Sequence, residues 1–136
     1  MKKYKIAALV PMRHSSERVP GKNYRDFAGS PLFYHIIQSL IESEFIDKIV
    51  IDTDSPDIAS LTKSCFPQVE ILKRPEHLLD GSVPMNDVLL NIIDQVPADF
   101  YLQTHSTNPL LSSRTIDMGI STFINNYPMY DSLFSV

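Results

Sequence analysis

The chain has 136 residues, the size of one domain, and 43% of them are hydrophobic, which excludes a disordered chain. Its single cysteine, Cys65, excludes an internal disulfide and a multi-cysteine zinc site, and it predicts a reducing, cytoplasmic location. No run of residues approaches the roughly 20 apolar residues of a membrane helix, so we expect no membrane partner.

The net charge of -4 is unevenly distributed along the chain. Residues 1–25 contain seven of the 12 cations and one acidic residue, a local charge of +6, so the other residues sum to -10. The acidic body predicts no nucleic-acid partner. The basic start indicates either a confined anionic ligand, such as a phosphate chain, or a solvated basic end.

The first half of the chain alternates predicted strands with predicted helices. Residues 4–10 form a short apolar run that is typical of a buried strand. A helix is predicted over residues 31–43, with Ser30 as its N-cap, because leucine and isoleucine recur on one helical face. Residues 48–53 are the second predicted strand, and a second helix is predicted over residues 56–64.

The second half continues the same alternation. Residues 68–72 are predicted as a strand, and the apolar residues within 88–96 repeat at helical spacing. Residues 100–103 are predicted as the fourth strand, and a last helix over 112–126 begins at a serine cap. Residues 131–136 are predicted as a further strand.

Strands that alternate with helices predict an α/β fold with a mainly parallel sheet, because a parallel connection needs a crossover long enough to hold a helix. The length predicts a single domain over residues 1–136. Val136 falls inside a predicted apolar strand, so we expect that the C-terminal part of the domain is missing from this chain.

A long loop follows the first predicted strand and combines cations, hydroxyls and a glycine. In open parallel sheets, ligands bind beyond the carboxyl ends of the strands. Arginine binds phosphate bidentately, lysine acts as a point charge, and glycine lets backbone amides approach. We therefore interpret the loop as a triphosphate site, with a merely solvated loop as the alternative. The residues behind this interpretation are Arg13, Ser15, Ser16, Arg18, Gly21, Lys22 and Asn23.

The order of residues in this loop is more specific than their type. VPMRHSSERVPGKN at residues 10–23, followed by AGSPL at 28–32, resembles the acylneuraminate cytidylyltransferase family, whose usual form is PARGGSKRIPGKN. The 3-deoxy-manno-octulosonate enzymes are more distant relatives. The resemblance covers essentially the whole chain, through IVIDTDSPDIA at 49–59, KRPEHL at 73–78 and LQTHSTNPLL at 102–111.

The sequence departs from the family pattern at several positions. His14 and Ser15 stand where the family commonly has two glycines, and Glu17 stands where it often has lysine. These changes imply a stiffer loop with one positive charge fewer, and His14 occupies space near the expected phosphates. LQTHSTNPLL carries two residues more than the family's LQPTSPL, so only Gln103 and residues 108–110 align securely.

The resemblance implies a Rossmann-like, three-layer nucleotidyltransferase domain. It implies that CTP and an acylneuraminate-type acidic sugar are the substrates, and that a CMP-sugar and pyrophosphate are the products. The anomeric hydroxyl of the sugar attacks the α-phosphorus, so the protein mainly has to align the reactants and neutralise charge. Arg13 and Lys22 are the expected catalytic residues, which contact the phosphates and stabilise the leaving pyrophosphate, and Ser16 assists them.

Matching positions also imply the rest of the binding site. The expected nucleotide-binding residues are Arg13, Ser15, Ser16, Lys22, Asn23, Arg74 and Ser82, and the expected sugar-binding residue is Gln103.

Simpler roles remain open for several of these residues. Arg74 is alternatively a surface residue paired with Glu76, and Ser82 is alternatively an ordinary loop residue. Gln103 is alternatively a cap at the end of its strand. Asp52 and Asp54 are spaced like metal ligands, but helix capping is the favoured interpretation for both.

Magnesium is the expected cofactor, because it bridges phosphate oxygens and offsets developing charge. The four histidines lie far apart in the sequence, and the resemblance places the family's metal-holding aspartates beyond Val136, so no residue of this chain is predicted as a metal ligand. It also places a dimerisation segment there, which implies a full-length homodimer. We therefore expect weak CTP binding and little synthetase activity from this chain alone.

Two alternatives accompany this interpretation. One keeps the reaction and changes the acidic sugar, for example to 3-deoxy-manno-octulosonate. The other is a nucleotide-binding module without catalysis, which the altered loop and the missing C-terminal part favour.

Overall fold

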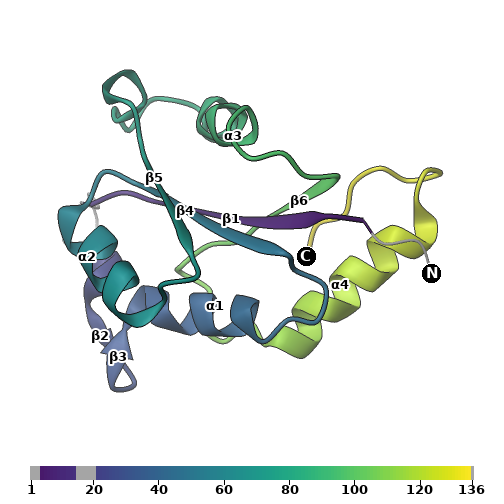
Figure 1. Cartoon of the computed structure of the whole chain (residues 1–136), viewed down its shortest axis with the longest axis horizontal. Coiled ribbons are helices and arrows are strands. Elements are labelled where there is room, and N and C mark those ends of the chain that lie inside the picture. Colours follow the sequence, from purple (N-terminus) through teal and green to yellow (C-terminus); the bar gives the residue numbers. More distant parts are fainter. Residues whose placement is uncertain (1–3, 15–20, 136) are drawn as a thin grey trace.

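A four-stranded sheet forms the centre of the protein in the computed structural model, which describes residues 4–14 and 21–135. The strand order is β5-β4-β1-β6, and all neighbouring strands are parallel, as Figure 1 shows. The predicted parallel α/β fold is therefore confirmed. The strands are β1 (Ile6–Met12), β4 (Lys48–Thr53), β5 (Glu70–Lys73) and β6 (Phe100–Gln103).

Helices cover both faces of this sheet and make the fold three-layered. The helix α3 packs alone over one face, and α1, α2 and α4 cover the other (Figure 1). Each helix lies where the apolar spacing of the sequence predicts one. Their bounds are α1 (Leu32–Ile41), α2 (Pro56–Cys65), α3 (Met85–Ile93) and α4 (Ser113–Asn126).

The central strand β1 is buried along its whole length and separates two apolar cores. Ala8 and Val10 point into the core beneath α1, whereas Ala7 and Leu9 point into the core beneath α3. Successive side chains of a strand alternate between faces, so a strand that is covered on both sides reads as a continuous apolar run. This is why the sequence signal at residues 4–10 is uninterrupted.

Short elements complete the connection between β1 and α1. A 3-10 helix (Lys22–Tyr24) is followed by a two-residue hairpin of β2 (Asp26–Phe27) and β3 (Ser30–Pro31). The hairpin turn places Ala28 and Gly29 at φ values of 51° and 92°, the left-handed pair that a tight hairpin needs. A second 3-10 helix (Glu76–Leu78) follows β5.

Two predicted local features are wrong. Ser30 does not cap α1, because it pairs with Phe27 in the hairpin, and Pro31 stands at the N-cap without a side-chain hydrogen bond. The predicted strand at residues 131–136 is also absent over its described part, 131–135. Those residues are exposed and pair with none of the described strands, and an apolar sequence becomes a strand only when a neighbour accepts its hydrogen bonds.

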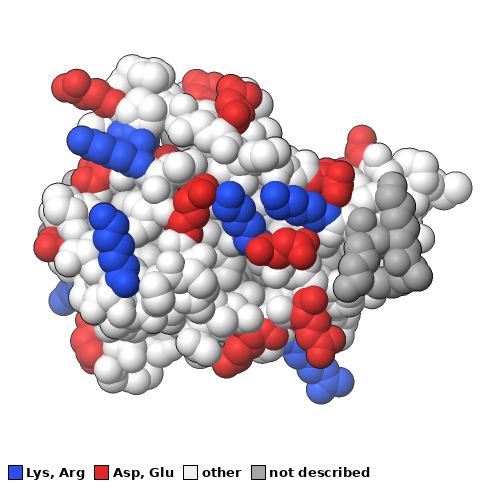
Figure 2. Space-filling model, viewed as in Figure 1, with Lys and Arg blue, Asp and Glu red and all other residues white. Residues whose placement is uncertain are grey.

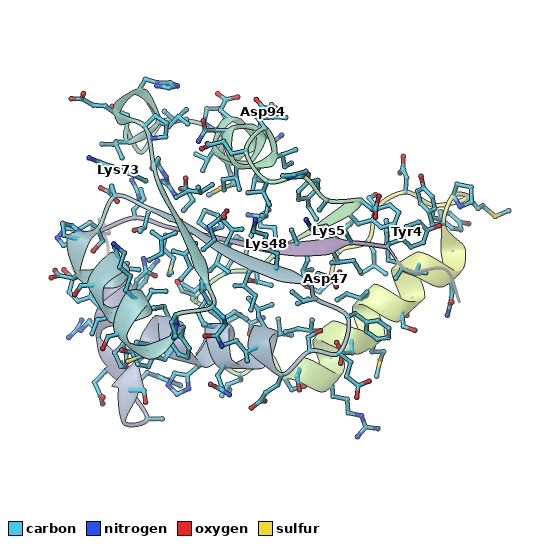
Figure 3. The ribbon with its side chains drawn as sticks, viewed as in Figure 1. Tyr4, Lys5, Asp47, Lys48, Lys73 and Asp94 are labelled. Carbon is cyan, nitrogen blue, oxygen red and sulfur yellow. The ribbon has the colours of Figure 1, made fainter. Side chains whose placement is uncertain are left out.

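Charged side chains lie at both ends of the sheet (Figure 3). Figure 3 labels Lys5, Asp47 and Lys48 at the amino end, where β1 and β4 begin, and Lys73 at the carboxyl end of β5. Basic and acidic side chains are interleaved on the face seen in Figure 2. None of the described helices is long and apolar enough to cross a membrane.

Candidate functional site

A cavity of about 290 Å³ opens at the carboxyl end of the sheet. Its walls come from the last residues of β1 and from the loops after β1, β5 and β6. These parts contribute residues 11–13, 22–23, Arg74 and 105–107, and the 78–88 segment completes the lining. The strand order reverses between β1 and β6, and in open α/β sheets the loops at such a switch point diverge and leave a crevice. The topology therefore produces the cavity where the sequence analysis expects a ligand.

Arg13 and Lys22 line this same cavity. Arg13 is the first residue after β1, and Lys22 is the first residue of the 3-10 helix that returns the chain toward α1. Both side chains are half-buried, which weakens the screening of their charge by water. Two cations around one cavity make a receptor for an anion that carries several negative charges. Ser15 and Ser16, the expected hydroxyl donors of this loop, lie outside the described residues.

Gly21 has the left-handed backbone conformation that turns the loop just before Lys22. Its φ is 65°, a left-handed conformation that glycine adopts without strain. A Cβ atom at this position lies 3.1 Å from ring carbons of Tyr24, so a side chain there also meets a neighbour. Both constraints favour glycine immediately before Lys22.

Asn23 is buried and connects the first loop to the loop after β6. Its amide nitrogen donates to the backbone oxygen of Arg13 at 2.9 Å, and its amide oxygen accepts from the Ser106 hydroxyl. Asn23 lines the cavity, as expected for a nucleotide-binding residue, but its amide also holds Arg13 in place. The sequence resemblance alone does not reveal this second role.

His14 is directed away from the expected phosphates. Its backbone N–H donates to Asp54 Oδ1 at 2.7 Å, and its Nδ1 lies 2.8 Å from Ser55 Oγ. Its ring stacks on Tyr24 with a centroid distance of 5.5 Å. His14 is not among the residues that line the cavity, so it anchors the loop to the start of α2 and leaves the cavity open.

Arg74 is buried and does not form the surface pair with Glu76. Its Nε lies 2.6 Å from Asp52 Oδ1, and the two side chains are 3% and 0% exposed. Arg74 also lines the cavity, as expected for a residue of the nucleotide pocket. Neither aspartate caps a helix: Asp52 lies within β4, and Asp54 accepts the His14 N–H.

Ser82 lies in the predicted segment, but it is exposed and does not line the cavity. Its backbone N–H and hydroxyl both donate to Asp80 Oδ1, each at 2.8 Å. Asp80 does line the cavity. The Ser82 N–H and then its hydroxyl stabilise the charged form and lower the pKa of Asp80, and the Arg13 charge lowers it further. Ser82 thus orients an acidic residue that the sequence analysis does not single out.

Gln103 ends β6 in register with Leu9 and is half-buried. It does not line the cavity. The residues of the following loop do so in its place, and the sequence analysis does not assign them: His105, Ser106 and Thr107. The one available signal is their position immediately after a strand of a parallel sheet.

The described residues contain no group of three or more His, Cys, Asp or Glu side chains that could hold a metal ion. The Asp52 carboxylate is already engaged by Arg74, and Asp80 stands as an exposed carboxylate on the cavity wall. The described residues therefore do not by themselves form a complete metal site.

Sequence comparison links the chain to enzymes that activate acidic sugars. It is 33% identical over 120 residues to the CMP-N,N'-diacetyllegionaminic acid synthase of Legionella pneumophila, with 82% of this chain and 50% of the relative covered. It is 26% identical over 121 residues to the 3-deoxy-manno-octulosonate cytidylyltransferase of Geobacter sulfurreducens, with 89% and 46% covered. The chain therefore spans about half the length of these curated relatives.

Structural comparison supports the same fold. CMP:2-keto-3-deoxy-manno-octonic acid synthetase, solved in complex with CTP, has a TM-score of 0.80 at 19% identity, covering 91% of this chain and 49% of that chain. Rv0371c of Mycobacterium tuberculosis, solved in complex with manganese, has a TM-score of 0.64 at 10% identity, covering 92% and 60%. The cytidylyltransferase family matches residues 7–136, so this chain, with its parallel sheet and its cavity at the carboxyl ends of the strands, belongs to the cytidylyltransferase family.

Proposed function

We propose that this chain binds CTP and supplies the nucleotide site of an enzyme that converts CTP and an acidic sugar into a CMP-sugar and pyrophosphate. The observation that carries the proposal is that Arg13 and Lys22 line one cavity at the carboxyl end of the sheet. Membership of the cytidylyltransferase family supports CTP as the nucleotide. The names of the relatives supply the class of sugar.

The proposed reaction needs a site of this charge. The sugar hydroxyl oxygen forms a bond to the α-phosphorus of CTP, the bond between that phosphorus and the bridging oxygen of the β-phosphate breaks, and the hydroxyl proton is released. Negative charge accumulates on the departing pyrophosphate. Arg13 and Lys22 offset that charge from fixed positions, so little reorganisation is needed as the bond breaks. Asn23 keeps Arg13 at the cavity through its bond to the Arg13 carbonyl.

The other predicted residues differ in how far their positions support the proposal. Arg74 lines the cavity from the loop directly after β5 and is the candidate contact for the cytidine moiety. Ser82 acts through Asp80, whereas Ser15 and Ser16 stay predictions from the family resemblance. Gln103 stays the predicted sugar contact, at the end of the strand next to β1. Magnesium stays the predicted cofactor and accompanies the nucleotide phosphates.

Ligand-dependent unfolding tests the nucleotide site directly. A ligand that binds the native state raises the melting temperature with concentration, so CTP is expected to stabilise the chain more than ATP or GTP does. Lys22→Ala is expected to weaken CTP binding on the order of tenfold, because it removes a charge-assisted contact to phosphate. Lys63→Ala, at an exposed position of α2, is the matched control and leaves the CTP shift unchanged.

The same measurement contradicts the proposal in two ways. If CTP does not raise the melting temperature, the cavity is not a nucleotide site. If Lys22→Ala and Lys63→Ala give the same CTP shift as the unmodified chain, the phosphate role of Lys22 is wrong. A pyrophosphate-release assay with CTP and a panel of acidic sugars, run on the complete protein, identifies the sugar. If no sugar in the panel gives pyrophosphate release, the enzymatic part of the proposal is wrong.

A further inference from the structure

A buried ion pair connects β4 to the wall of the cavity. Arg74 Nε lies 2.6 Å from Asp52 Oδ1, with the side chains 3% and 0% exposed. The backbone N–H of Arg74 also donates to the Thr53 oxygen at 3.1 Å. Arg74 is therefore fixed to β4 through both its backbone and its side chain, at the point where β5 has ended and the cavity begins.

This pair is poorly built for stabilising the fold. Asp52 Oδ2 is buried and has no hydrogen-bond partner among the described residues. A buried carboxylate gains from its partner only when its remaining lone pairs are also satisfied, and an unsatisfied oxygen retains its desolvation cost. The neighbouring strands already pair through Lys48 and Glu70, which remain about one-third exposed. Stabilisation of the fold therefore does not account for this ion pair, whereas a fixed orientation of the Arg74 side chain does.

The carboxylate engages one edge of the guanidinium group and leaves the other available. Arginine carries five N–H groups, and Asp52 takes the one on Nε. Among the described residues, Asp52 is the hydrogen-bond partner that the structure gives the Arg74 side chain, and the bond is made by Nε. Arg74 lines the cavity, and its terminal N–H groups are the donors that the bond to Asp52 leaves unused.

The surroundings of Arg74 suit a nucleobase better than a phosphate chain. The wall between β5 and α3 contributes the apolar side chains Leu78, Val83 and Val88, whereas Arg13 and Lys22 belong to the loop after β1. Cytosine presents two adjacent acceptors, O2 and N3, which match two guanidinium N–H groups. Uracil presents a donor at N3, which such an edge rejects because a donor then faces a donor.

We propose that Asp52 is a positioning residue that holds the Nε edge of Arg74 so that its terminal N–H groups meet the acceptor edge of cytosine. This inference rests on the proposed CTP site and deepens it. Asp52 does not touch the nucleotide. It acts through Arg74, and its effect is on discrimination between cytosine and uracil and not on binding of the phosphates.

Calorimetric titration with three probes tests the assignment. CTP, UTP and inorganic tripolyphosphate are each titrated into the unmodified chain, into Asp52→Asn and into the control Glu70→Gln, which alters the exposed pair on the same two strands. Asp52→Asn is expected to weaken CTP binding on the order of tenfold, to narrow the ratio of CTP to UTP affinity, and to leave tripolyphosphate binding unchanged. Glu70→Gln is expected to change none of the three.

A second variant keeps the inference testable if Asp52→Asn does not fold, as judged by circular dichroism. Arg74→Lys retains a cation beside Asp52 but lacks the forked donor edge. It is expected to narrow the CTP to UTP ratio as well. When both variants fold, adding Asp52→Asn to Arg74→Lys is expected to change the ratio by less than about twofold, because the two residues act as one unit.

Three results would overturn the inference. An unchanged CTP to UTP ratio in Asp52→Asn, or in Arg74→Lys if the first variant does not fold, shows that Asp52 does not set base selectivity. An equal loss of CTP and tripolyphosphate shows a general structural role. A full additional loss in the double variant shows that Asp52 does not act through Arg74. Failure of the unmodified chain to bind CTP contradicts the proposed function itself and is thereby distinguished from these outcomes.

Discussion

Individual side chains around the cavity depend on one another through hydrogen bonds that cross between loops. Asn23 holds the Arg13 carbonyl and accepts from Ser106, so it links the loops after β1 and β6. Ser82 holds the carboxylate of Asp80. The resemblance implies that Asn23 and Ser82 contact the nucleotide. In the structure Asn23 lines the cavity and holds the Arg13 carbonyl, whereas Ser82 does not line the cavity and holds Asp80.

The buried Asp52 gives the stability of the fold a definite pH dependence. Burial raises the pKa of Asp52, and the hydrogen bond and charge of Arg74 oppose that rise without cancelling it. The folded state then holds this proton more tightly than the unfolded state, so the contribution of Asp52 to stability falls as pH rises above its ordinary value of 3.8. Asp52→Asn cannot titrate at this position.

Denaturant unfolding of both proteins between about pH 4 and pH 7 checks this sign. The free energy of unfolding of the unmodified chain, taken relative to Asp52→Asn, is expected to decrease as pH rises. The other carboxylates are common to both proteins and cancel in the difference. A relative stability that increases with pH would show that Arg74 dominates and that the pKa of Asp52 is lowered.

At the scale of elements, the start of α2 secures the first loop. Ser55 caps the helix by accepting the Ile58 N–H at 3.2 Å, and the same hydroxyl lies 2.8 Å from His14 Nδ1. The loop and the helix therefore share one side chain. This double use gives His14 a structural role at a position where the resemblance leads us to expect glycine.

Replacing the two capping serines one at a time separates the contribution of a helix cap from the contribution of the contact with His14. Ser112→Ala removes the cap of α4, where the hydroxyl accepts the Thr115 N–H at 3.2 Å, and it is expected to cost about 1 kcal/mol of unfolding free energy. Ser55→Ala loses a similar cap and the contact with His14, so a larger cost, up to about 2 kcal/mol, is expected. Urea denaturation measures both values. Equal costs would mean that the His14 contact contributes nothing.

The whole molecule places its cavity at one end of a sheet that is covered on both faces. The chain spans about half the length of its curated relatives, and the cavity walls here come from the loops after β1, β5 and β6 and the segment leading into α3. The cavity that we propose as the nucleotide site is thus lined by described residues of this chain, and the proposed reaction also requires a place for the sugar.

We therefore expect the isolated chain to bind CTP but to catalyse the reaction with the sugar slowly. CTP is expected to stabilise it, while pyrophosphate release with CTP and acidic sugars stays well below the roughly 1 s⁻¹ at the lower end of typical enzyme turnover. A coupled pyrophosphate assay measures the rate, with Lys22→Ala as the background. Turnover in the typical range would show that this chain contains the complete active site.

Local sequence patterns determined the order of strands and helices in this protein. Short apolar runs, helical apolar spacing and helix start signals depend on neighbours within a few residues, so all four sheet strands and all four helices lie where the sequence predicts them. Motif order also identified Arg13, Lys22, Asn23 and Arg74, which meet at the cavity. Ser30 and residues 131–135 were predicted wrongly, because pairing with other strands, or its absence, overrides local propensity.

Tertiary structure alone decided which side chains became partners. Asp52 and Arg74 are 22 residues apart, and Asn23 and Ser106 are 83 residues apart, so no local pattern connects them. Parallel strands align their carboxyl ends although long crossovers separate them in sequence, and this alignment brings their loops around one cavity. The register of β4 against β5 then buries the Asp52 carboxylate beside Arg74, and no sequence motif specifies that contact.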